Sequence, residues 1–331
     1  MYQGHPVVCV TPAGRRRFLK LLVPQVLASP LVDRFDLWVN TEVAADLAFL
    51  RSLERLDPRV RLVAHPTGAP PSVEAIGAFS RLAMEPGTIY LRLDDDVVWT
   101  EPGFFDRLLA FRVAHPAYFL VMPLVLNNAL CSNILQTFGK IAVSPPVTTT
   151  CLDKVGWRDA DFALALHRFV LGVIDRGEIE RLHCGPVEIA LNRFSINCIC
   201  WFGHDMALSG GVVGPDEEEE LSAAMGVRLR RGHCFDTDVA VAHFSFYPQR
   251  ERLDPSGVLD AYEAILARRD DVKPLLARVR ALHDEASVHD DGATWAFPPP
   301  PSGARVRLRR WWKRRRRPRR PTVELRPGPC F

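Results

Sequence analysis

Residues 90–97, YLRLDDDV, place three consecutive aspartates, Asp94, Asp95 and Asp96, directly after a short apolar run. Adjacent carboxylates repel one another, so they need a cation, strong hydrogen bonds or full hydration to ionise together. Apolar residues on both sides argue against a hydrated charge run. A hard divalent cation with oxygen ligands would relieve the repulsion. An acidic helix N-terminus is the alternative structural interpretation.

The chain before this cluster alternates strand and helix signals. Apolar runs predict strands, and helical spacing predicts helices between them: strands at 7–10, 35–39, 60–63 and 88–93, helices at 18–26, 41–53 and 72–82. This alternation indicates βαβ units and a mainly parallel central sheet flanked by helices, an α/β fold. Ligands of such sheets bind at the carboxyl ends of the strands. The fourth strand ends at Asp94, so the pattern places the three carboxylates where a ligand is expected.

The rest of the chain predicts further elements and a division into three parts. The helical segments are 103–114, 159–174 and 255–286, and the strands are 195–202 and 239–246. We expect an α/β domain over 1–250, a helical extension over 251–297 and a Pro-rich, basic, disordered tail over 298–331.

A hydrophobic strand that ends in an aspartate cluster resembles the DxD motif of GT-A glycosyltransferases, in particular bacterial family-2 enzymes. The resemblance covers roughly residues 5–250. It implies a Rossmann-like fold and transfer of a sugar from a nucleotide sugar to a hydroxyl acceptor. Position by position, it assigns Asp96 to a Mn²⁺ or Mg²⁺ ion and Asp94 to the nucleotide, with Asp94 also a candidate metal ligand. Asp95, the middle residue, would assist in binding the donor.

The turn after the first strand is expected to bind the donor, because in that family this loop holds the nucleotide base. Its candidate residues are Thr11, Pro12, Gly14 and Arg15. Gly14 permits close backbone approach, and Arg15 or one of the two arginines after it would reach a diphosphate. A hydrated basic helix start is the alternative for each arginine. Asn128, which follows a strand-like run, is a further candidate for the donor sugar.

A second acidic cluster follows a glycine-rich turn in residues 210–222, GGVVGPDEEEELS. It resembles the turn and acidic pair of inverting GT-A enzymes, in which one carboxylate deprotonates the acceptor hydroxyl. We expect Glu217 or Glu218 to be this base and Asp216 to cap the helix that begins there. A hydrated acidic helix start is the alternative.

Two later segments complete the expected site. His243 ends the apolar run at 239–246 and matches the C-terminal histidine that completes the metal site in several GT-A enzymes; a buried core histidine is the alternative. Residues 195–205 border the acceptor in that family. There Trp201 would stack on a sugar, or pack in the core, and His204 or Asp205 would bond its hydroxyls.

The charge of the 331-residue chain is unevenly distributed. Residues 304–331 contain 12 Lys/Arg and one acid, whereas residues 1–303 contain 30 Lys/Arg and 38 Asp/Glu. Arginines interleaved with Trp311 and Trp312 suit an anionic membrane surface. They also suit nucleic acid, which would make the chain a nucleic-acid-binding protein, and a hydrated disordered tail is the alternative. We do not expect nucleic acid as a partner, because the body shows no nucleic-acid-binding fold. With no secretory signal, no transmembrane run and eight cysteines in mostly apolar surroundings, the sequence predicts a cytoplasmic protein, peripheral on the membrane.

Two other classes of protein fit the same residues. A nucleotidyltransferase also uses a metal–aspartate cluster and a nucleotide, although no glycine-rich triphosphate loop follows the first strand. A non-catalytic binding protein on a GT-A scaffold would tolerate the loss of Glu217 and Glu218. The resemblance favours a glycosyltransferase of surface-glycan synthesis, with a glycan or another hydroxyl compound as acceptor.

Overall fold

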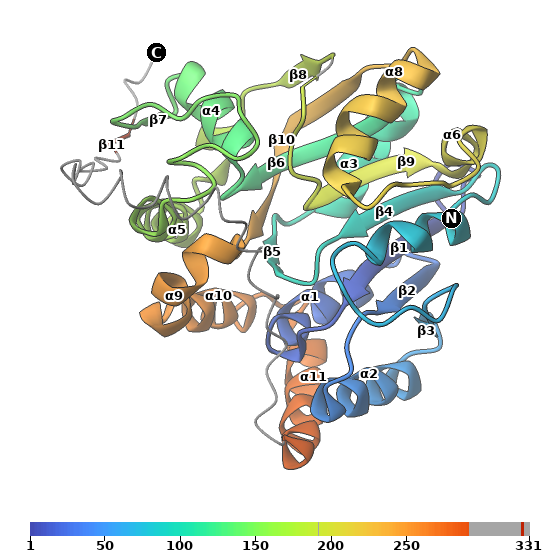
Figure 1. Cartoon of the computed structure of the whole chain (residues 1–331). Helices are drawn as coiled ribbons and strands as arrows, with labels where there is room; N and C mark the ends of the chain where they lie inside the picture. Colours follow the sequence, from blue (N-terminus) through green and yellow to red (C-terminus); the bar gives the residue numbers. More distant parts are fainter. Residues whose placement is uncertain (191, 291–325, 328–331) are drawn as a thin grey trace, which may run out of the picture.

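A computed structural model of the chain describes residues 1–190, 192–290 and 326–327 (Figure 1). Its central sheet has the strand order β3-β2-β1-β4-β9-β6-β10-β5, with β8 paired to β10. The strands are β1 (Val7–Ala13), β2 (Arg34–Val39), β3 (Val60–Val63), β4 (Ile89–Leu93), β5 (Val97–Thr100), β6 (Leu120–Leu126), β8 (Pro186–Ile189), β9 (Cys198–Phe202) and β10 (His233–His243). Helices lie on both faces of this sheet, so the predicted α/β fold class is confirmed.

The N-terminal half of the sheet is parallel, as the alternation predicts. Strand β1 pairs in parallel with β2 and β4, and β2 pairs in parallel with β3. Every residue of β1 and β4 is buried, because helices cover both faces of a parallel sheet. Helices α1 (Arg16–Ala28) and α2 (Ala44–Leu56) follow β1 and β2. The predicted helix at 72–82 is instead the short 3₁₀ helix η1 (Ile76–Leu82), after the prolines at 66, 70 and 71.

The C-terminal half of the sheet is mixed. Strand β9 runs antiparallel to both β4 and β6, whereas β6 and β10 are parallel. The register of β10 shifts between Asp236 and Ala240, and the strand begins at His233, earlier than the apolar run predicts. The helices of this half are α3 (Phe104–Ala114), α4 (Ala129–Thr137), α5 (Ala160–Asp175) and α6 (Gly203–Leu208).

The acidic segment, residues 216–220, begins a helical stretch that contains one π-helical turn. It consists of α7 (Glu217–Glu219), a π-helical turn η3 (Glu220–Ala224) and α8 (Met225–Leu229). The chain then returns through β10 to α9 (Arg250–Leu253), α10 (Val258–Leu266) and α11 (Lys273–Ala286). Helix α11 packs against α1 and α2 at the far end of the molecule from α3 and α8 (Figure 1).

The structure can be compared with the predictions for the C-terminal tail, the cysteines and membrane-spanning helices. The predicted disordered tail lies outside the described residues, apart from β11 (Arg326–Pro327), which pairs with β7 (Ile141–Ala142). Seven of the eight cysteines are described, and all seven are free thiols, of which only Cys184 is partly exposed. Across the described ranges, no helix combines the length and the hydropathy that a bilayer span requires.

Candidate functional site

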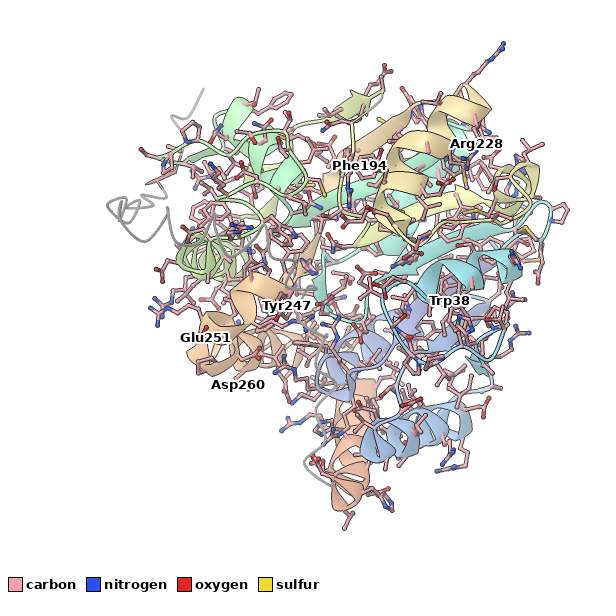
Figure 2. The ribbon with its side chains drawn as sticks, in the orientation of Figure 1. Trp38, Phe194, Arg228, Tyr247, Glu251 and Asp260 are labelled. Carbon is pink, nitrogen blue, oxygen red and sulfur yellow. The ribbon has the colours of Figure 1, made fainter. Side chains whose placement is uncertain are left out.

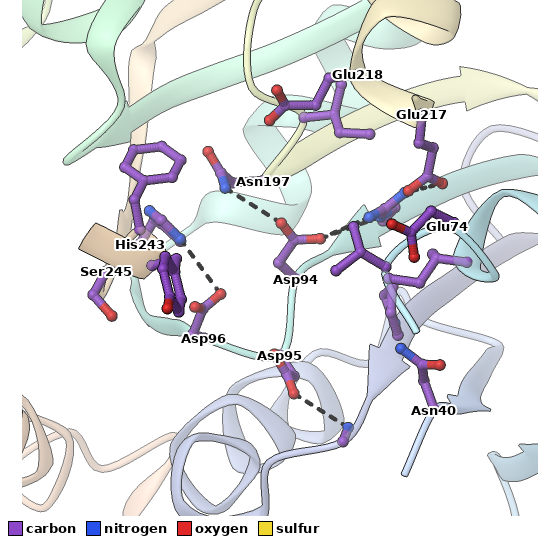
Figure 3. Close-up of a pocket in the computed structure, with 18 of the residues that line it drawn as sticks. Asn40, Glu74, Asp94, Asp95, Asp96, Asn197, Glu217, Glu218, His243 and Ser245 are labelled. Atoms are coloured by element: carbon purple, nitrogen blue, oxygen red, sulfur yellow. Dashed lines mark hydrogen bonds and ion pairs between the residues drawn. The ribbon is translucent and has the colours of Figure 1, made fainter. Parts of the chain in front are cut away.

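A cavity of about 620 Å³ opens where β1 and β4 end. The turn after β1 and the aspartate cluster after β4 form one side. The other side comes from residues 152–157, 193–197, 215–218 and 243–250 (Figure 3). This volume is typical of a site that encloses one small molecule. The carboxyl ends of the parallel strands therefore hold the cavity, as the strand alternation predicts.

Asp96 and His243 face each other across the floor of this cavity. Asp96 Oδ1 lies 3.5 Å from Nε2 of His243, and both side chains are buried (Figure 3). The other ring nitrogen, Nδ1, lies 3.2 Å from the carbonyl oxygen of Asn127. Donation from Nδ1–H to this carbonyl directs Nε2 toward Asp96, the arrangement in which a histidine presents one nitrogen to a metal.

Neighbouring charges shift the pKa values of Asp96 and His243 in opposite directions. Burial opposes ionisation of Asp96, but Arg15 and His243 hold the pKa of that carboxyl well below its usual range. Burial likewise lowers the pKa of His243, but Asp96 outweighs burial, and the pKa of His243 is raised above its usual value. Each member of the pair therefore favours the charged form of the other.

Asp95 ties the aspartate turn to the turn after β1. Its Oδ2 accepts from the backbone N–H of Gly14 at 3.2 Å, and its Oδ1 accepts from Nε of Arg15 at 2.9 Å. Nη1 of Arg15 lies 3.0 Å from Oδ2 of Asp96. Arg15 thus bridges two of the three carboxylates. The next two arginines point elsewhere, Arg16 to Asp46 and Arg17 to Asp254.

Asp94 faces the opposite wall from the Asp96–His243 pair. Its Oδ1 accepts from Nη2 of Arg92 at 3.0 Å, and its Oδ2 accepts from the amide of Asn197 at 3.3 Å (Figure 3). Burial raises the pKa of Asp94 to about 6, although Arg92 opposes this change. The structure does not place Asp94 beside Asp96 and His243 as a third metal ligand.

The three candidate carboxylates of the acidic segment all reach the cavity, in different environments. Asp216 caps α7 by accepting from the backbone N–H of Glu219 at 3.2 Å, as expected, and pairs with Arg193 at 2.9 Å. Glu217 is buried in an ion pair with Arg92. Glu218 is 27% exposed, lies 3.4 Å from Arg193, and accepts from the thiol of Cys151 at 3.2 Å.

The cavity fits a divalent cation held partly by a ligand. In the described part of the chain, no group of three or more His, Cys, Asp or Glu side chains is arranged around a metal position. Asp96 and His243 alone supply one carboxylate and one imidazole, a combination that Mn²⁺ accepts. Mg²⁺-type ions are commonly bound by one or two carboxylates together with substrate phosphates and water. Two protein ligands are therefore enough when a diphosphate supplies further oxygens.

Several predicted residues lie outside the cavity. Thr11 and Asn128 are buried behind it; Asn128 caps α4 and donates 3.1 Å to the side chain of Asn197. Trp201 is buried in β9, where its indole donates to the carbonyl of Ala83. His204 and Asp205 lie in α6, and Asp205 pairs with Arg231. The expectation that Trp201, His204 and Asp205 contact an acceptor in this cavity is therefore corrected, because packing and ion pairing explain them.

The cavity also contains residues that the sequence interpretation missed. Arg92 and Asn197 hold Asp94, and Arg193 holds the acidic segment. Trp157 and Tyr247 also line the cavity. Arg92 had a detectable signal, because it is the single charged residue within an otherwise apolar strand. Asn197, Arg193 and Trp157 lie in loops and Tyr247 in a single 3₁₀ turn, and none of them belongs to a recognisable pattern.

Comparison with known proteins identifies no activity for this chain. No family model matches it, and no curated protein matches it. Glucosyl-3-phosphoglycerate synthase from Mycobacterium tuberculosis, solved with Mn²⁺, UDP-glucose and phosphoglyceric acid, is 14% identical, with 84% of this chain and 80% of that chain covered and a TM-score of 0.43. S. aureus TarS 1–349 is 9% identical, with coverages of 86% and 72% and a TM-score of 0.41. Similarity at this level assigns no activity, so function must be inferred from the cavity.

Proposed function

We propose that the chain is a metal-dependent GT-A-type glycosyltransferase that moves a sugar from a nucleotide sugar to a hydroxyl acceptor with inversion. One observation carries the proposal. The Asp96–His243 pair and the Glu218 carboxylate line one cavity, at the strand ends where the α/β fold binds ligands. A cation-binding pair and a partly exposed base are the two groups that a single displacement requires.

Asp96 and His243 would hold the divalent ion, Mn²⁺ or Mg²⁺, together with oxygens of the donor diphosphate. When bound, the ion would neutralise the negative charge that develops on the departing nucleoside diphosphate. Arg15, which already contacts Asp96, is placed to add a fixed positive charge to the same diphosphate. Asp95 keeps this guanidinium in position.

The nucleoside would lie against the turn after β1. Pro12, Gly14, Asn40 and Glu74 line this end of the cavity. Asn40 exchanges two hydrogen bonds with the backbone of Ser72, which fixes the segment that carries Glu74. A Cβ at Gly14 would lie 2.8 Å from the carbonyl oxygen of Asn40, so only glycine allows the two turns to meet this closely.

Glu218 is the proposed general base. Glu217 is less suited, because a buried ion pair with Arg92 occupies its carboxylate. Glu218 would take the proton of the acceptor hydroxyl while the acceptor oxygen bonds to the anomeric carbon. The bond from that carbon to the diphosphate oxygen breaks at the same time, and the diphosphate leaves with the electron pair.

A donor screen tests the proposed function. Purified protein is incubated with Mn²⁺ and a panel of nucleotide sugars, and release of nucleoside diphosphate is measured. One donor should release its nucleotide only with the metal. Release of pyrophosphate from a nucleoside triphosphate and a sugar phosphate would identify a nucleotidyltransferase instead. Binding of a nucleotide sugar without any turnover, with a range of hydroxyl acceptors present, would favour a non-catalytic binding protein.

We also propose that the arginine-rich segment 305–320 brings the enzyme to an anionic membrane, where surface glycans are made. Co-sedimentation of the full chain with vesicles tests this. Vesicles with anionic lipid should retain the protein at low salt and lose it at high salt. Equal retention by vesicles of neutral lipid would contradict an electrostatic contact.

A further inference from the structure

One wall of the cavity is aromatic and apolar. Trp157, Phe246, Tyr247 and Leu152 line it, and we call these four residues the aromatic wall. Leu152 is 51% exposed and Tyr247 is 52% exposed, although both belong to a concave site. Figure 2 labels Tyr247 beside helix α9, and this residue lines the cavity. Apolar side chains exposed together at a cavity indicate a surface that a ligand covers.

The half of this wall that carries Trp157 is held rigidly. Asp153 accepts from the backbone N–H groups of Val155 and Gly156 at 2.8 and 2.7 Å, and from the hydroxyl of Thr148 at 2.7 Å. A Cβ at Gly156 would lie 2.9 Å from the Cα of Ala129, so this turn packs directly on α4. The backbone turn that carries Trp157 is therefore fixed, so less conformational entropy is lost when a ligand packs on the indole.

In the half that carries Tyr247, hydrogen bonds of Gln249 hold the backbone in place. Oε1 of Gln249 accepts from the backbone N–H of Phe246 and from the amide of Asn127, both at 3.0 Å. Phe246 also packs on His243, with ring centroids 4.6 Å apart, and on Trp157, with centroids 6.1 Å apart. The aromatic wall is thus continuous with the proposed metal ligand.

The same wall adjoins the proposed base. Leu152 follows Cys151, whose thiol donates to Oε2 of Glu218 at 3.2 Å. Burial raises the pKa of Cys151 to about 12, so the sulfur keeps its proton and remains a donor at neutral pH. A molecule that lies on the aromatic wall therefore has its edge near both Glu218 and the Asp96–His243 pair.

The charge of the cavity disfavours an anionic acceptor. Seven carboxylates and four arginines line it. On the side of the aromatic wall, Arg193 lies within 4 Å of Asp216, Glu218 and Glu219, so acidic groups already neutralise it. Arg250 also lines the cavity, three residues after Tyr247, and the charges of Asp96 and Asp95 act on its guanidinium. Among the described residues that line the cavity, no further arginine or lysine adjoins the aromatic wall.

We propose that the aromatic wall binds the pyranose ring of an uncharged glycoside, the acceptor, through the apolar C–H face of the sugar. This inference rests on the proposed function and names the acceptor class of that site. Aromatic rings offer a large, rigid apolar surface to such a face. The hydroxyl that reacts then points from the ring edge toward Glu218.

Initial rates with two acceptor panels test this inference. One panel contains uncharged methyl glycosides, and the other contains phosphorylated or carboxylated hydroxyl compounds. Nucleotide release from the donor is measured with and without each acceptor, for wild type, Trp157→Ala and Tyr247→Ala. Phe138→Ala is the matched control, because Phe138 is 48% exposed but lies outside the cavity. Circular dichroism confirms that each variant is folded.

An uncharged glycoside should accelerate release in wild type. Trp157→Ala should raise the KM for that glycoside about tenfold. The KM for the donor should rise by a smaller factor than the KM for the acceptor, and Phe138→Ala should match wild type. The inference is overturned if donor release occurs but only anionic acceptors accelerate it, if no glycoside does, or if folded Trp157→Ala keeps the wild-type KM for the acceptor. Absence of any donor binding or release would instead contradict the proposed function itself.

Discussion

Arg92 and Glu217 form a buried ion pair that links β4 to helix α7, with side-chain exposures of 5% and 7%. The same guanidinium holds Asp94 at 3.0 Å. Arg92 therefore connects the two acidic clusters of the sequence. Glu217→Ala should lower the free energy of unfolding by about 3 kcal/mol, because the buried guanidinium loses a partner. Urea unfolding measures this loss, and a stability equal to wild type would contradict it.

Glu218→Gln tests the assignment of the base. The amide cannot take a proton, so kcat should fall by about 10²–10⁴-fold while the donor KM changes little. Glu251→Gln, an exposed change outside the cavity, is the control. If Glu217→Gln lowered kcat more than Glu218→Gln with both proteins folded, the roles of the two residues would be exchanged.

Asp95→Asn should affect structure more than metal binding. Asp95 accepts from the backbone of Gly14 and from Arg15, so the change weakens the contact between the two turns. We expect a loss of about 1–3 kcal/mol in unfolding free energy, with Mn²⁺ still required for donor binding. Thermal unfolding and a donor titration with and without Mn²⁺ measure the two effects. Loss of metal dependence with unchanged stability would make Asp95 a metal ligand.

Buried histidines should make stability depend on pH. Burial lowers the pKa of His233 to about 4, whereas the unfolded chain has its usual value near 6.5. As pH falls from about 6.5 to 4, the unfolded state takes up the proton first, so the folded state loses stability. Asp94 and Asp236 act in the opposite sense, because burial raises the pKa of each to about 6 and the folded state takes up their protons first.

The variant His233→Phe isolates the contribution of His233 to the pH dependence of stability from those of Asp94 and Asp236. His233 packs between Phe119 and Phe194, an environment that accepts a phenyl ring. Between pH 7 and pH 5, the variant should lose about 2 kcal/mol less unfolding free energy than wild type. Chemical unfolding at the two pH values measures this difference. Parallel pH profiles would show that His233 is not kept neutral by the fold.

The strand alternation was sufficient to predict the fold class and the position of the aspartate cluster at the carboxyl ends of the strands. Asp94, Asp95 and Asp96 follow β4, and a parallel sheet collects such strand ends at one edge. His243 was predicted from family resemblance, and the structure brings it to Asp96 because β10 pairs antiparallel with β5, the strand that follows the aspartates. The aspartates and His243 each adjoin an apolar run that the sequence identifies as a strand.

The residues of the aromatic wall could not be predicted, and Trp201 was predicted wrongly to line the cavity, because these positions depend on how distant segments and strands are arranged. In the antiparallel register of β4 and β9, Cys198 lies opposite Leu93, and Trp201 lies opposite Tyr90. This register puts Asn197 beside Asp94 and moves Trp201 away from the cavity. A parallel β9 would have reversed that outcome. Trp157 lies in a loop and Tyr247 in a single 3₁₀ turn, and residues distant in sequence hold both in place, so no local pattern identifies them.

Donor binding by wild type and Asp96→Ala, each with and without Mn²⁺, tests the central claim most directly. Isothermal titration with the nucleotide sugar selected by the screen gives the affinities, and Asp270→Ala, an exposed change, is the control. Wild type and the control should bind the donor at least tenfold more tightly with Mn²⁺, and folded Asp96→Ala should lose this difference. Equal Mn²⁺ dependence in wild type and Asp96→Ala would contradict a metal site built on Asp96 and His243.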